Sequence, residues 1–369
     1  MDKRTDYCNI PISIEEKMGR NLHKLRNHPI EIVKRKILEY LDQCKDYKFT
    51  IFEDLSPVVS VVENFDKLLI PKDHPARSKS DTYYVNEEMV LRTHTSAHQN
   101  ELLTKGHTSF VVVGDVYRKD EIDKSHYPVF HQMELLTLIK DGINPEVELK
   151  RLLSELVKHL FAGCDYRFNT DYFPFTNPSF EIEVMYRGKW LEILGCGVVQ
   201  PKILENNGIL GKSAIAFGLG IERLAMVLFD IPDIRYLWST DEKFLSQFSS
   251  GNIVSFKPYS ELPDQTRDIS FYLSKGRTTS MEEANDNKWL DENDFFEFVR
   301  SIAGDLMEQV HLIDTFYNKK LDKYSRTYRM IYSPNGPNFK DPSEFCTLIN
   351  EIQNKIRSIV ENSLNVTLR

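Results

Sequence analysis

The sequence predicts an α+β protein in which a large antiparallel sheet flanked by helices is followed by a smaller βαββαβ module. In the first two thirds of the chain, extended segments outnumber the helices between them and connect through hairpins, which favours an antiparallel sheet over a doubly wound one. In the last third, the apolar periodicity follows the order strand, helix, strand, strand, helix, strand. With 369 residues, the chain is long enough for two or three domains.

Composition and charge exclude several classes of protein. No apolar run reaches the length of a membrane span, so we expect no membrane association. The five cysteines are scattered without a CxxC pair, which argues against a disulfide framework and a zinc site and fits a reducing compartment. Residues 1–20 carry no apolar signal core and include acids that a transit peptide would avoid, so no targeting segment is visible.

Residues 1–48 are expected to form an N-terminal extension that ends in an amphipathic helix. Asn27 is suited to cap this helix, with Pro29 in its first turn. The apolar positions at helical spacing are Ile30, Val33, Ile37 and Leu41. The three consecutive cations at 34–36 are then expected on the solvent side of the helix.

Residues 49–229 are expected to form the first domain, around the large sheet. The sequence predicts short strands and turns at 49–75, an extended segment that becomes helical after Thr95 at 91–103, a hairpin at 110–140, a helix at 149–160, an antiparallel pair at 180–186 and 189–199, and a strand at 214–219 followed by a helix to 228. Residues 230–255, with Pro232 and a polar stretch at 249–252, are expected to be a hinge.

Residues 256–369 are expected to form the βαββαβ module. Its elements are a strand at 267–273, a helix at 294–309, strands at 310–317 and 324–332, a last helix, and a closing strand at 365–368. Asp341, Pro342 and Glu344 give the last helix a capping box. The polar, acidic stretch 278–292 is expected to be a loop insertion.

The loop of the 110–140 hairpin carries the most chemistry. It offers a guanidinium at Arg118, carboxylates, histidines and an aromatic ring at Phe130. A site for ATP needs a cation on the phosphates, acceptors for the adenine amine and a ring for the base. The alternative is an exposed charged hairpin, but the ordered string at 126–134 that follows favours a site.

Two segments are locally basic although the net charge is −8. Residues 17–36 hold seven Lys or Arg against one acid, and residues 317–330 hold five against one, with three tyrosines interleaved. Cations hold phosphates and rings stack on unpaired bases, so the second segment is a candidate RNA-binding surface. The expected RNA-binding cations are Lys319, Lys320, Lys323, Arg326 and Arg329. The alternative is that both segments are merely solvated faces.

Four histidines in these strings raise the question of a metal site. The set is His94, His98, His126 and His131, and its spacing fits no tetrahedral pattern. Hydrogen bonding to a nucleotide or substrate explains them better. No nucleophile elbow is present, which argues against a Ser-His-Asp hydrolase.

Five strings occur in an order that identifies a family resemblance. They are Arg92-Thr93-His94-Thr95-Ser96-Ala97-His98-Gln99, Arg118-Lys119-Asp120-Glu121 with His126-Tyr127-Pro128-Val129-Phe130-His131-Gln132-Met133-Glu134, Phe173-Pro174-Phe175-Thr176, Trp190-Leu191-Glu192, and Ala216-Phe217-Gly218-Leu219-Gly220-Ile221-Glu222-Arg223. Together they resemble the motifs of class II aminoacyl-tRNA synthetases, in the version of single-chain, mitochondrial-type phenylalanyl-tRNA synthetases. Residues 256–369 resemble the ferredoxin-like anticodon-binding domain of that type. The resemblance covers nearly the whole chain.

The resemblance implies roles for individual residues. Arg118 would hold the α-phosphate of ATP, Arg223 the γ-phosphate, and Phe130 would stack on adenine. The implied ATP-binding set is Arg118, Asp120, His126, Phe130, Gln132 and Arg223, of which Arg118 and Arg223 are the implied catalytic residues. The implied amino-acid-binding set is Ser96, Ala97, His98, Gln99, Ser125, His126, Tyr127, Gln132, Met133, Glu134, Phe173, Phe175, Glu192, Ala216 and Phe217.

The resemblance also implies an activity, cofactors and partners. The expected reaction is ATP-dependent attachment of phenylalanine to tRNA(Phe) through phenylalanyl-adenylate, with Mg2+ bridging the ATP phosphates. No magnesium ligand can be named, because Asn177 stands where bacterial relatives carry a glutamate ligand. The expected protein is a monomer without an obligate protein partner, in the mitochondrial matrix or another organelle. The alternatives are a catalytically silent RNA-binding relative and an adenylating ligase that uses no tRNA.

Overall fold

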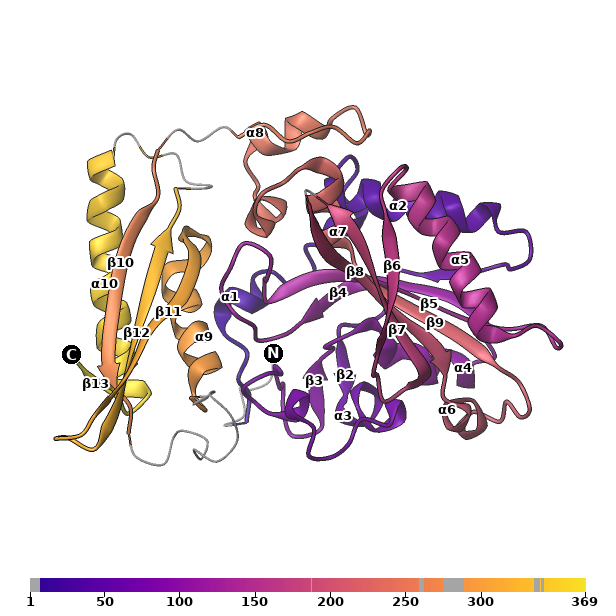
Figure 1. Cartoon of the computed structure of the whole chain (residues 1–369), viewed down its shortest axis with the longest axis horizontal. Coiled ribbons are helices and arrows are strands. Elements are labelled where there is room, and N and C mark those ends of the chain that lie inside the picture. Colours follow the sequence, from indigo (N-terminus) through magenta and orange to yellow (C-terminus); the bar gives the residue numbers. More distant parts are fainter. Residues whose placement is uncertain (1–6, 187, 259–261, 275–288, 335–338, 340–341) are drawn as a thin grey trace.

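The computed structural model describes residues 7–186, 188–258, 262–274, 289–334, 339 and 342–369. It has two parts that lie side by side, a larger one built on a seven-stranded sheet and a smaller C-terminal one built on a four-stranded sheet (Figure 1). Within the described ranges, no helix is both long and apolar enough to cross a membrane.

The large sheet is antiparallel apart from one edge. Its order is β1 (Thr50–Phe52), β4 (Ser109–Tyr117), β5 (Val129–Leu138), β9 (Ala214–Gly220), β8 (Lys189–Val199), β7 (Thr176–Tyr186) and β6 (Tyr166–Asp171). Only the pairing of β1 with β4 is parallel. The expected antiparallel sheet is therefore confirmed, with one short parallel strand added at its edge.

Helices α2 (Pro29–Gln43), α5 (Pro145–Leu160) and α7 (Ile221–Phe229) cover one face of this sheet (Figure 1). The buried apolar stripes of all three helices join the core of the first domain, together with residues of β4, β5, β8 and β9. Helices α4 (Gln99–Thr104) and α6 (Pro201–Asn206) contribute Leu102, Leu103, Ile203 and Leu204 to a separate apolar cluster, with Ala216 and Leu136 from the sheet.

The remaining elements of this part are short. They are α1 (Ile12–Glu15), β2 (Val58–Ser60), α3 (Val61–Asn64), β3 (Met89–Leu91) and α8 (Glu242–Leu245), with 3-10 turns at Leu22–Lys24, Asp66–Leu68, Pro75–Arg77, Thr95–His98, Ile234–Trp238 and Ser246–Phe248. β2 and β3 form a small antiparallel sheet of their own. The expected change from extended to helical backbone at Thr95 is confirmed.

The first helix differs from expectation in two details. The apolar face is confirmed, since Ile30, Val33 and Ile37 are fully buried. However, the side chain of His28, not Asn27, caps the helix by accepting from the Ile30 amide at 3.2 Å. Lys34 is buried rather than solvated, because its ammonium lies 2.5 Å from the Glu53 carboxylate.

The expected hinge is largely core. Tyr236, Phe244, Phe248 and Phe256 are buried in the main cluster of the first part. The Phe244 and Phe248 rings lie 5.0 Å apart, and Phe248 packs edge-on against Phe229 at 5.3 Å. Aromatic burial on this scale fixes the segment to the first domain. Residues 230–256 are thus not a free linker, and the exact domain boundary stays a prediction.

The C-terminal domain has the predicted order of elements. It runs through β10 (Gln265–Tyr272), α9 (Glu292–Ala303), β11 (Met307–Asn318), β12 (Lys323–Tyr332), α10 (Pro342–Ser363) and β13 (Thr367–Leu368), with the sheet order β11-β12-β10-β13. All three pairings are antiparallel, which confirms the ferredoxin-like βαββαβ fold.

Three expectations for this domain need correction or lie outside the described residues. The first helix ends at Ala303, and β11 already begins at Met307 after a 3-10 turn (Gly304–Leu306), so the helix is shorter than expected. Asp341, the expected cap of α10, lies outside the described residues, as does most of the expected loop insertion. The end of that stretch is described, and it is not a solvated loop. There the Trp289 side chain is 1% exposed and packs in the core of the domain.

Trp289→Ala should remove about 3–5 kcal/mol of stability from the C-terminal domain, because it leaves a large cavity in a packed core. The Trp289 ring lies 5.2 Å from Phe271 and 5.9 Å from Phe295. Urea unfolding followed by circular dichroism measures the loss. Leu290→Ala is the control, since the neighbouring Leu290 is 50% exposed and should change stability little. Equal effects of the two substitutions would contradict this packing.

Candidate active site

One face of strand β5 carries the polar residues of the site. Residues Phe130, Gln132 and Glu134 alternate with His131 and Met133, so the two sets point to opposite faces of the sheet. In the antiparallel register of β5 with β9, Gln132 lies opposite Gly220, Glu134 opposite Gly218 and Leu136 opposite Ala216. A polar row on β5 therefore runs beside a row of small residues on β9.

The small residues leave room that larger side chains would fill. A Cβ atom at Gly218 would come within 2.9 Å of the Gln132 amide nitrogen, and one at Gly220 would touch the Phe130 ring at 3.9 Å. On the next strand, a Cβ at Gly195 would stand 2.8 Å from the Phe173 ring. The glycines of β8 and β9 thus keep the sheet surface open beneath these side chains.

Two arginines mark one end of this face. The Arg118 Nε donates to the Thr93 carbonyl at 2.7 Å, and its guanidinium lies 5.2 Å from the centre of the Phe130 ring. Arg223, in the first turn of α7, donates to the Glu192 carbonyl at 3.2 Å and lies 3.4 Å from its carboxylate. The Arg118 residue is exposed, and the charges of Asp120, Glu192 and Arg223 are near enough to act on it. Two cations near one end of this face favour an anionic ligand.

A buried carboxylate marks the middle of the face. Glu134 is 3% exposed, accepts from the Ser96 hydroxyl and from the Gln99 amide at 2.6 Å, and burial raises its pKa to about 7 against the effect of these bonds. The Gln99 Oε1 is buried without a hydrogen-bond partner among the described residues. A carboxylate beside a free carbonyl oxygen suits an ammonium group, which has three donors to place.

Two aromatic rings stand beside the small residues of β8 and β9. The Phe173 and Phe175 rings are stacked at 5.8 Å with an angle of 13° between their planes. Phe175 packs against the cluster that holds Ala216 and Val199. Aromatic rings and a methyl group form a surface suited to an apolar, ring-bearing side chain.

The comparisons with known proteins match both parts of the chain. Residues 10–248 match the class II core domain of tRNA synthetases, and residues 260–369 match the ferredoxin-fold anticodon-binding domain. The chain is 49% identical to the chloroplastic/mitochondrial phenylalanine--tRNA ligase of Arabidopsis thaliana over 98% of this chain and 82% of the relative. It is 43% identical to the mitochondrial ligase of Mus musculus over 89% and 79%, and 37% identical to that of Saccharomyces cerevisiae over 98% and 92%.

This chain belongs to the phenylalanine--tRNA ligase family of class II aminoacyl-tRNA synthetases. The mitochondrial names of the single-chain relatives confirm the expected organellar type. Class II synthetases use ATP and a divalent metal ion. Within the described part of this ligase, no group of three or more His, Cys, Asp or Glu side chains could hold a metal ion.

Several residues expected at the amino-acid site of the ligase point elsewhere. Met133 and Phe217 lie on the opposite face of the sheet, in the main core, because each alternates with the residues that face the pocket. Ala97 packs in a small cluster with Val59, Tyr84 and Val90. The His98 ring is engaged on both sides, with Arg92 at 2.9 Å and Glu101 at 3.4 Å. The contacts recorded for these four side chains are with other parts of the protein, and their expected role at the amino-acid site stays a prediction.

The structure also adds residues to the site. His94 lies at the pocket edge, 6.3 Å from the Phe175 ring, and its ring nitrogens are buried without a hydrogen-bond partner among the described residues. Burial lowers the pKa of His94 to about 3, so its ring is neutral. Thr95 donates its amide to Gln132 at 3.2 Å and so fixes that side chain. The string at 92–99 already contained both residues, but only the structure shows which groups they contact.

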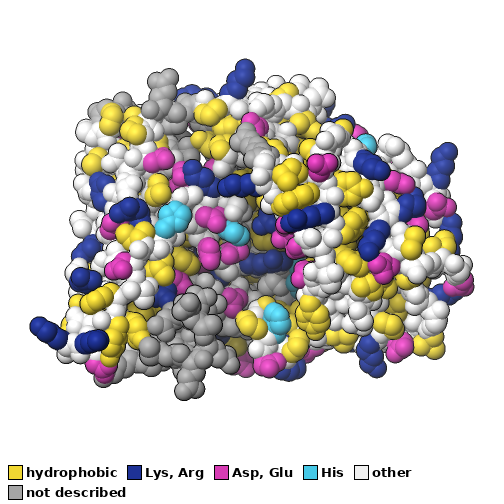
Figure 2. Space-filling model, in the orientation of Figure 1, with side chains coloured by type: hydrophobic (Ala, Val, Ile, Leu, Met, Phe, Trp, Pro, Cys, Tyr) yellow, Lys and Arg dark blue, Asp and Glu magenta, His cyan; other side chains and the backbone are white. Residues whose placement is uncertain are grey.

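The loop between β4 and β5 is held by the C-terminal domain. Figure 2 shows acidic, basic and histidine side chains gathered along the boundary between the two domains. Arg300 donates to the Asp120 carbonyl at 2.7 Å, the Val310 amide donates to the Ile122 carbonyl at 3.0 Å, and Lys119 pairs with Asp294 at 3.3 Å. The conformation of this loop therefore depends on a domain more than a hundred positions later in the sequence.

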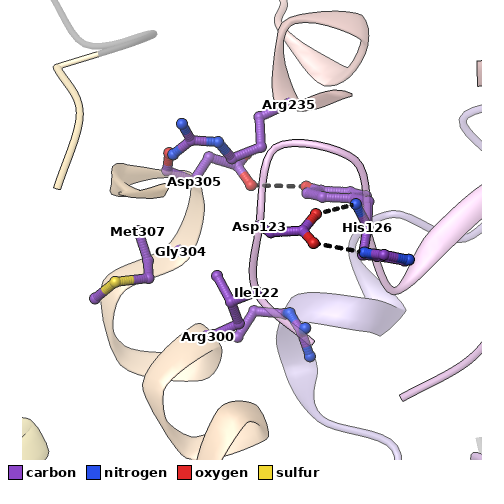
Figure 3. A pocket seen from close by; sticks show the side chains of 9 residues that line it. Ile122, Asp123, His126, Arg235, Arg300, Gly304, Asp305 and Met307 are labelled. Atoms are coloured by element: carbon purple, nitrogen blue, oxygen red, sulfur yellow. Dashed lines mark hydrogen bonds and ion pairs between the residues drawn. The ribbon is translucent and has the colours of Figure 1, made fainter. Parts of the chain in front are cut away.

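Three more expected site residues lie in this loop. Figure 3 shows Asp123 pointing towards His126, in a small pocket that Arg300, Gly304 and Asp305 also line. The Asp123 carboxylate accepts from the Ser125 amide and hydroxyl and lies 2.8 Å from His126 Nδ1, and this bond raises the pKa of His126. Tyr127 is buried beneath the loop and donates to Asp305 at 2.7 Å, so its hydroxyl is a contact between the two domains, and its expected role at the amino-acid site stays a prediction.

The expected tRNA-binding cations differ in exposure. Lys319 and Lys320 are exposed in the turn after β11, and Lys323 is half-buried beside them. Arg329 is exposed, but its guanidinium lies 2.9 Å from Asp268. Arg326 is 4% exposed and pairs with Glu292 at 2.8 Å, so it supports the core of the C-terminal domain and does not present its charge to solvent. The expectation for Arg326 was wrong.

The KM for phenylalanine should rise as the pH falls below about 7, by roughly tenfold per pH unit, because a proton then occupies the Glu134 carboxylate that should meet the ammonium. The folded pKa of Glu134 is raised, so the carboxylate form that binds is present above that pH and lost below it. Pyrophosphate exchange at varied phenylalanine measures the effect, with the KM for ATP as control. Glu134→Gln should have a high KM without this pH dependence, and identical pH profiles for both substrates would contradict the role of Glu134.

Proposed function

We propose that this protein attaches phenylalanine to tRNA(Phe) in two steps, in the mitochondrion. In the first step, a phenylalanine carboxylate oxygen attacks the α-phosphorus of ATP, and pyrophosphate leaves. In the second, a hydroxyl of the terminal ribose of tRNA attacks the acyl carbon, and AMP leaves. The observation that carries the proposal is the polar row on β5, which has the Arg118 guanidinium beside Phe130 at one end, the buried Glu134 further along, and the stacked Phe173 and Phe175 rings near the neighbouring strands.

The end of the face that bears the arginines suits ATP. Phe130 offers its ring to adenine, Arg118 its charge to the α-phosphate, and Arg223 its charge to the γ-phosphate. Bound in this way, a bent triphosphate would present its α-phosphorus to the phenylalanine carboxylate. No side chain needs to act as a nucleophile, so catalysis consists of positioning and neutralisation of phosphate charge.

The other end suits phenylalanine. Glu134 and Gln99 Oε1 would receive the ammonium, with the Ser96 hydroxyl and the Gln99 amide holding the carboxylate in place. The ring would enter the pocket of Phe173, Phe175 and Ala216. Aromatic pairs of this kind contribute about 0.5–1.5 kcal/mol beyond burial. The neutral His94 ring can donate a hydrogen bond to a carboxylate at the pocket edge.

Magnesium would arrive with ATP. Mg2+ in nucleotide sites is commonly held by one or two carboxylates plus phosphate oxygens and water, so a protein cage is not needed. Asp120 and Glu192 are the carboxylates whose charges act on Arg118, and they fit this limited requirement. Bound there, the ion would neutralise charge on the phosphates.

The C-terminal domain would bind tRNA(Phe) through the tip of the hairpin between β11 and β12. Lys319, Lys320 and Lys323 surround this tip, next to the exposed Phe316 and Tyr317. Cations beside exposed rings suit single-stranded RNA. The same domain argues against an adenylating ligase without tRNA, and the arginine pair argues against a catalytically silent RNA-binding relative. We propose that the working form is a monomer.

Arg118→Ala should lower the rate of phenylalanine-dependent pyrophosphate exchange about a hundredfold, or ~3 kcal/mol, because it removes charge stabilisation at the reacting phosphate. The exchange assay needs no tRNA and therefore tests the first step alone. Arg151→Ala, on the surface of α5, is the matched control and should retain full activity. Near-normal exchange in the Arg118 variant would refute the assignment.

Replacing Lys319, Lys320 and Lys323 together by Ala should weaken tRNA binding and leave pyrophosphate exchange unchanged. If each cation meets one phosphate, the dependence of log affinity on log salt should become shallower by about 2 to 3. Arg329→Ala should have a smaller effect, because Asp268 already neutralises that charge. Filter binding across salt concentrations gives both numbers. An unaltered salt dependence in the triple variant would place the RNA elsewhere.

A further inference from the structure

Glu222 is a buried carboxylate beside the site that touches none of the groups assigned to substrates. It lies in the first turn of α7 and is 1% exposed. Both its oxygens accept from the His131 main-chain amide, at 2.9 and 2.7 Å, and Oε1 also lies 2.8 Å from the ring Nδ1 of His131. A buried carboxylate held by three close contacts to one residue is a rigid connection.

The connection forms where the sheet ends. The ladder between β5 and β9 stops at the pair of Gln132 and Gly220, because the chain then turns into α7 at Ile221. The amide of His131 would have no strand residue to accept its hydrogen bond, and a buried amide without a partner is costly. Glu222 supplies the missing acceptor. The carboxylate also lies at the positive end of the helix, where a negative charge is favourable.

Both ends of this connection are next to ATP-site residues. His131 stands between Phe130 and Gln132, whose side chains face the opposite side of the strand. Glu222 immediately precedes Arg223. One carboxylate therefore fixes the strand that would hold adenine relative to the helix that would hold the γ-phosphate.

The His131 ring is itself held in place. It is fully buried, stacks on Trp238 at 5.6 Å with an angle of 25° between the planes, and contacts the His23 ring at 5.1 Å. Ring packing from two sides leaves the imidazole one orientation, in which Nδ1 meets Glu222. The buried contact between His131 and Glu222 is thus a rigid joint between β5 and α7, unlike an ion pair on the protein surface.

We propose that Glu222 is a positioning residue for ATP in the adenylation step. It locks the main chain between Phe130 and Gln132 to the helix of Arg223, so that adenine and the γ-phosphate meet their partners simultaneously. This inference rests on the proposed function, because it assumes that Phe130 and Arg223 bind the same nucleotide. Ser96, Gln99 and Glu134 make no contact with this joint that the structure records, so phenylalanine binding should not depend on it.

Glu222→Gln tests the proposal, since the amide keeps the shape but places N–H donors against the donors of His131. In pyrophosphate exchange, the KM for ATP should rise about tenfold, which equals roughly 1.4 kcal/mol. The KM for phenylalanine and the thermal unfolding midpoint should change little. His131→Gln keeps the main-chain bond to Glu222 and loses the ring contacts with Glu222, Trp238 and His23, so its KM for ATP should rise by a smaller factor.

The outcomes separate the alternatives. An unchanged KM for ATP in a folded Glu222 variant would overturn the proposal. A parallel rise in both KM values with a lower unfolding midpoint would also overturn it, since Glu222 would then be merely structural. If Glu222→Gln fails to fold, His131→Gln provides the test. The proposal then requires that His131→Gln raise the KM for ATP and change the KM for phenylalanine little. Wild-type protein without phenylalanine-dependent exchange would refute the proposed function instead.

Discussion

The antiparallel register of β5 with β9 is the constraint on which the rest of the site depends. It sets Gln132 and Glu134 beside Gly220 and Gly218, so polar side chains on one strand stand next to open space on its neighbour. A shift of one residue would turn Glu134 into the core and bring His131 and Met133 to the surface. The strand pairing therefore determines both where a ligand can lie and in which order its parts meet the protein.

Around this register, the molecule is built to hold the site from three directions. The segment at 92–99 reaches Glu134 through Ser96 and Gln99. Helix α7 is tied to β5 by Glu222 and His131. The loop between β4 and β5 is held by Arg300 and Asp294 of the C-terminal domain. The C-terminal domain, which is expected to bind tRNA, therefore contacts the loop that follows Arg118. This loop is a structural element shared by the expected ATP site and the expected tRNA-binding domain.

The order of elements could be predicted from the sequence because it follows from apolar periodicity and from turns, which are local. Ion pairs between residues far apart in the sequence could not be predicted. The sequence therefore favours solvent-exposed positions for Lys34 and Arg326, whereas in the structure both are buried and paired with Glu53 and Glu292. The similarity of motifs identified positions of the site but not the direction of side chains. Strand alternation, which separates Met133 from Gln132 and Glu134, was a signal already present in the sequence. The sequence does not reveal that the aromatic residues of 236–256 are core, because Pro232 and the polar stretch at 249–252 are typical of a linker.

The central claim is that phenylalanine lies along this face with its ring over Ala216, at the end farthest from Arg118. The measurement is the ratio of kcat/KM for phenylalanine over para-chlorophenylalanine in Ala216→Gly, Phe217→Leu and the wild type. Ala216 faces the pocket side of β9 and Phe217 the core side. The account predicts a ratio that falls by about tenfold or more in Ala216→Gly, because a methyl-sized contact in a pocket discriminates on this scale, and a ratio unchanged in Phe217→Leu. An unchanged ratio in a folded Ala216→Gly protein would contradict the account.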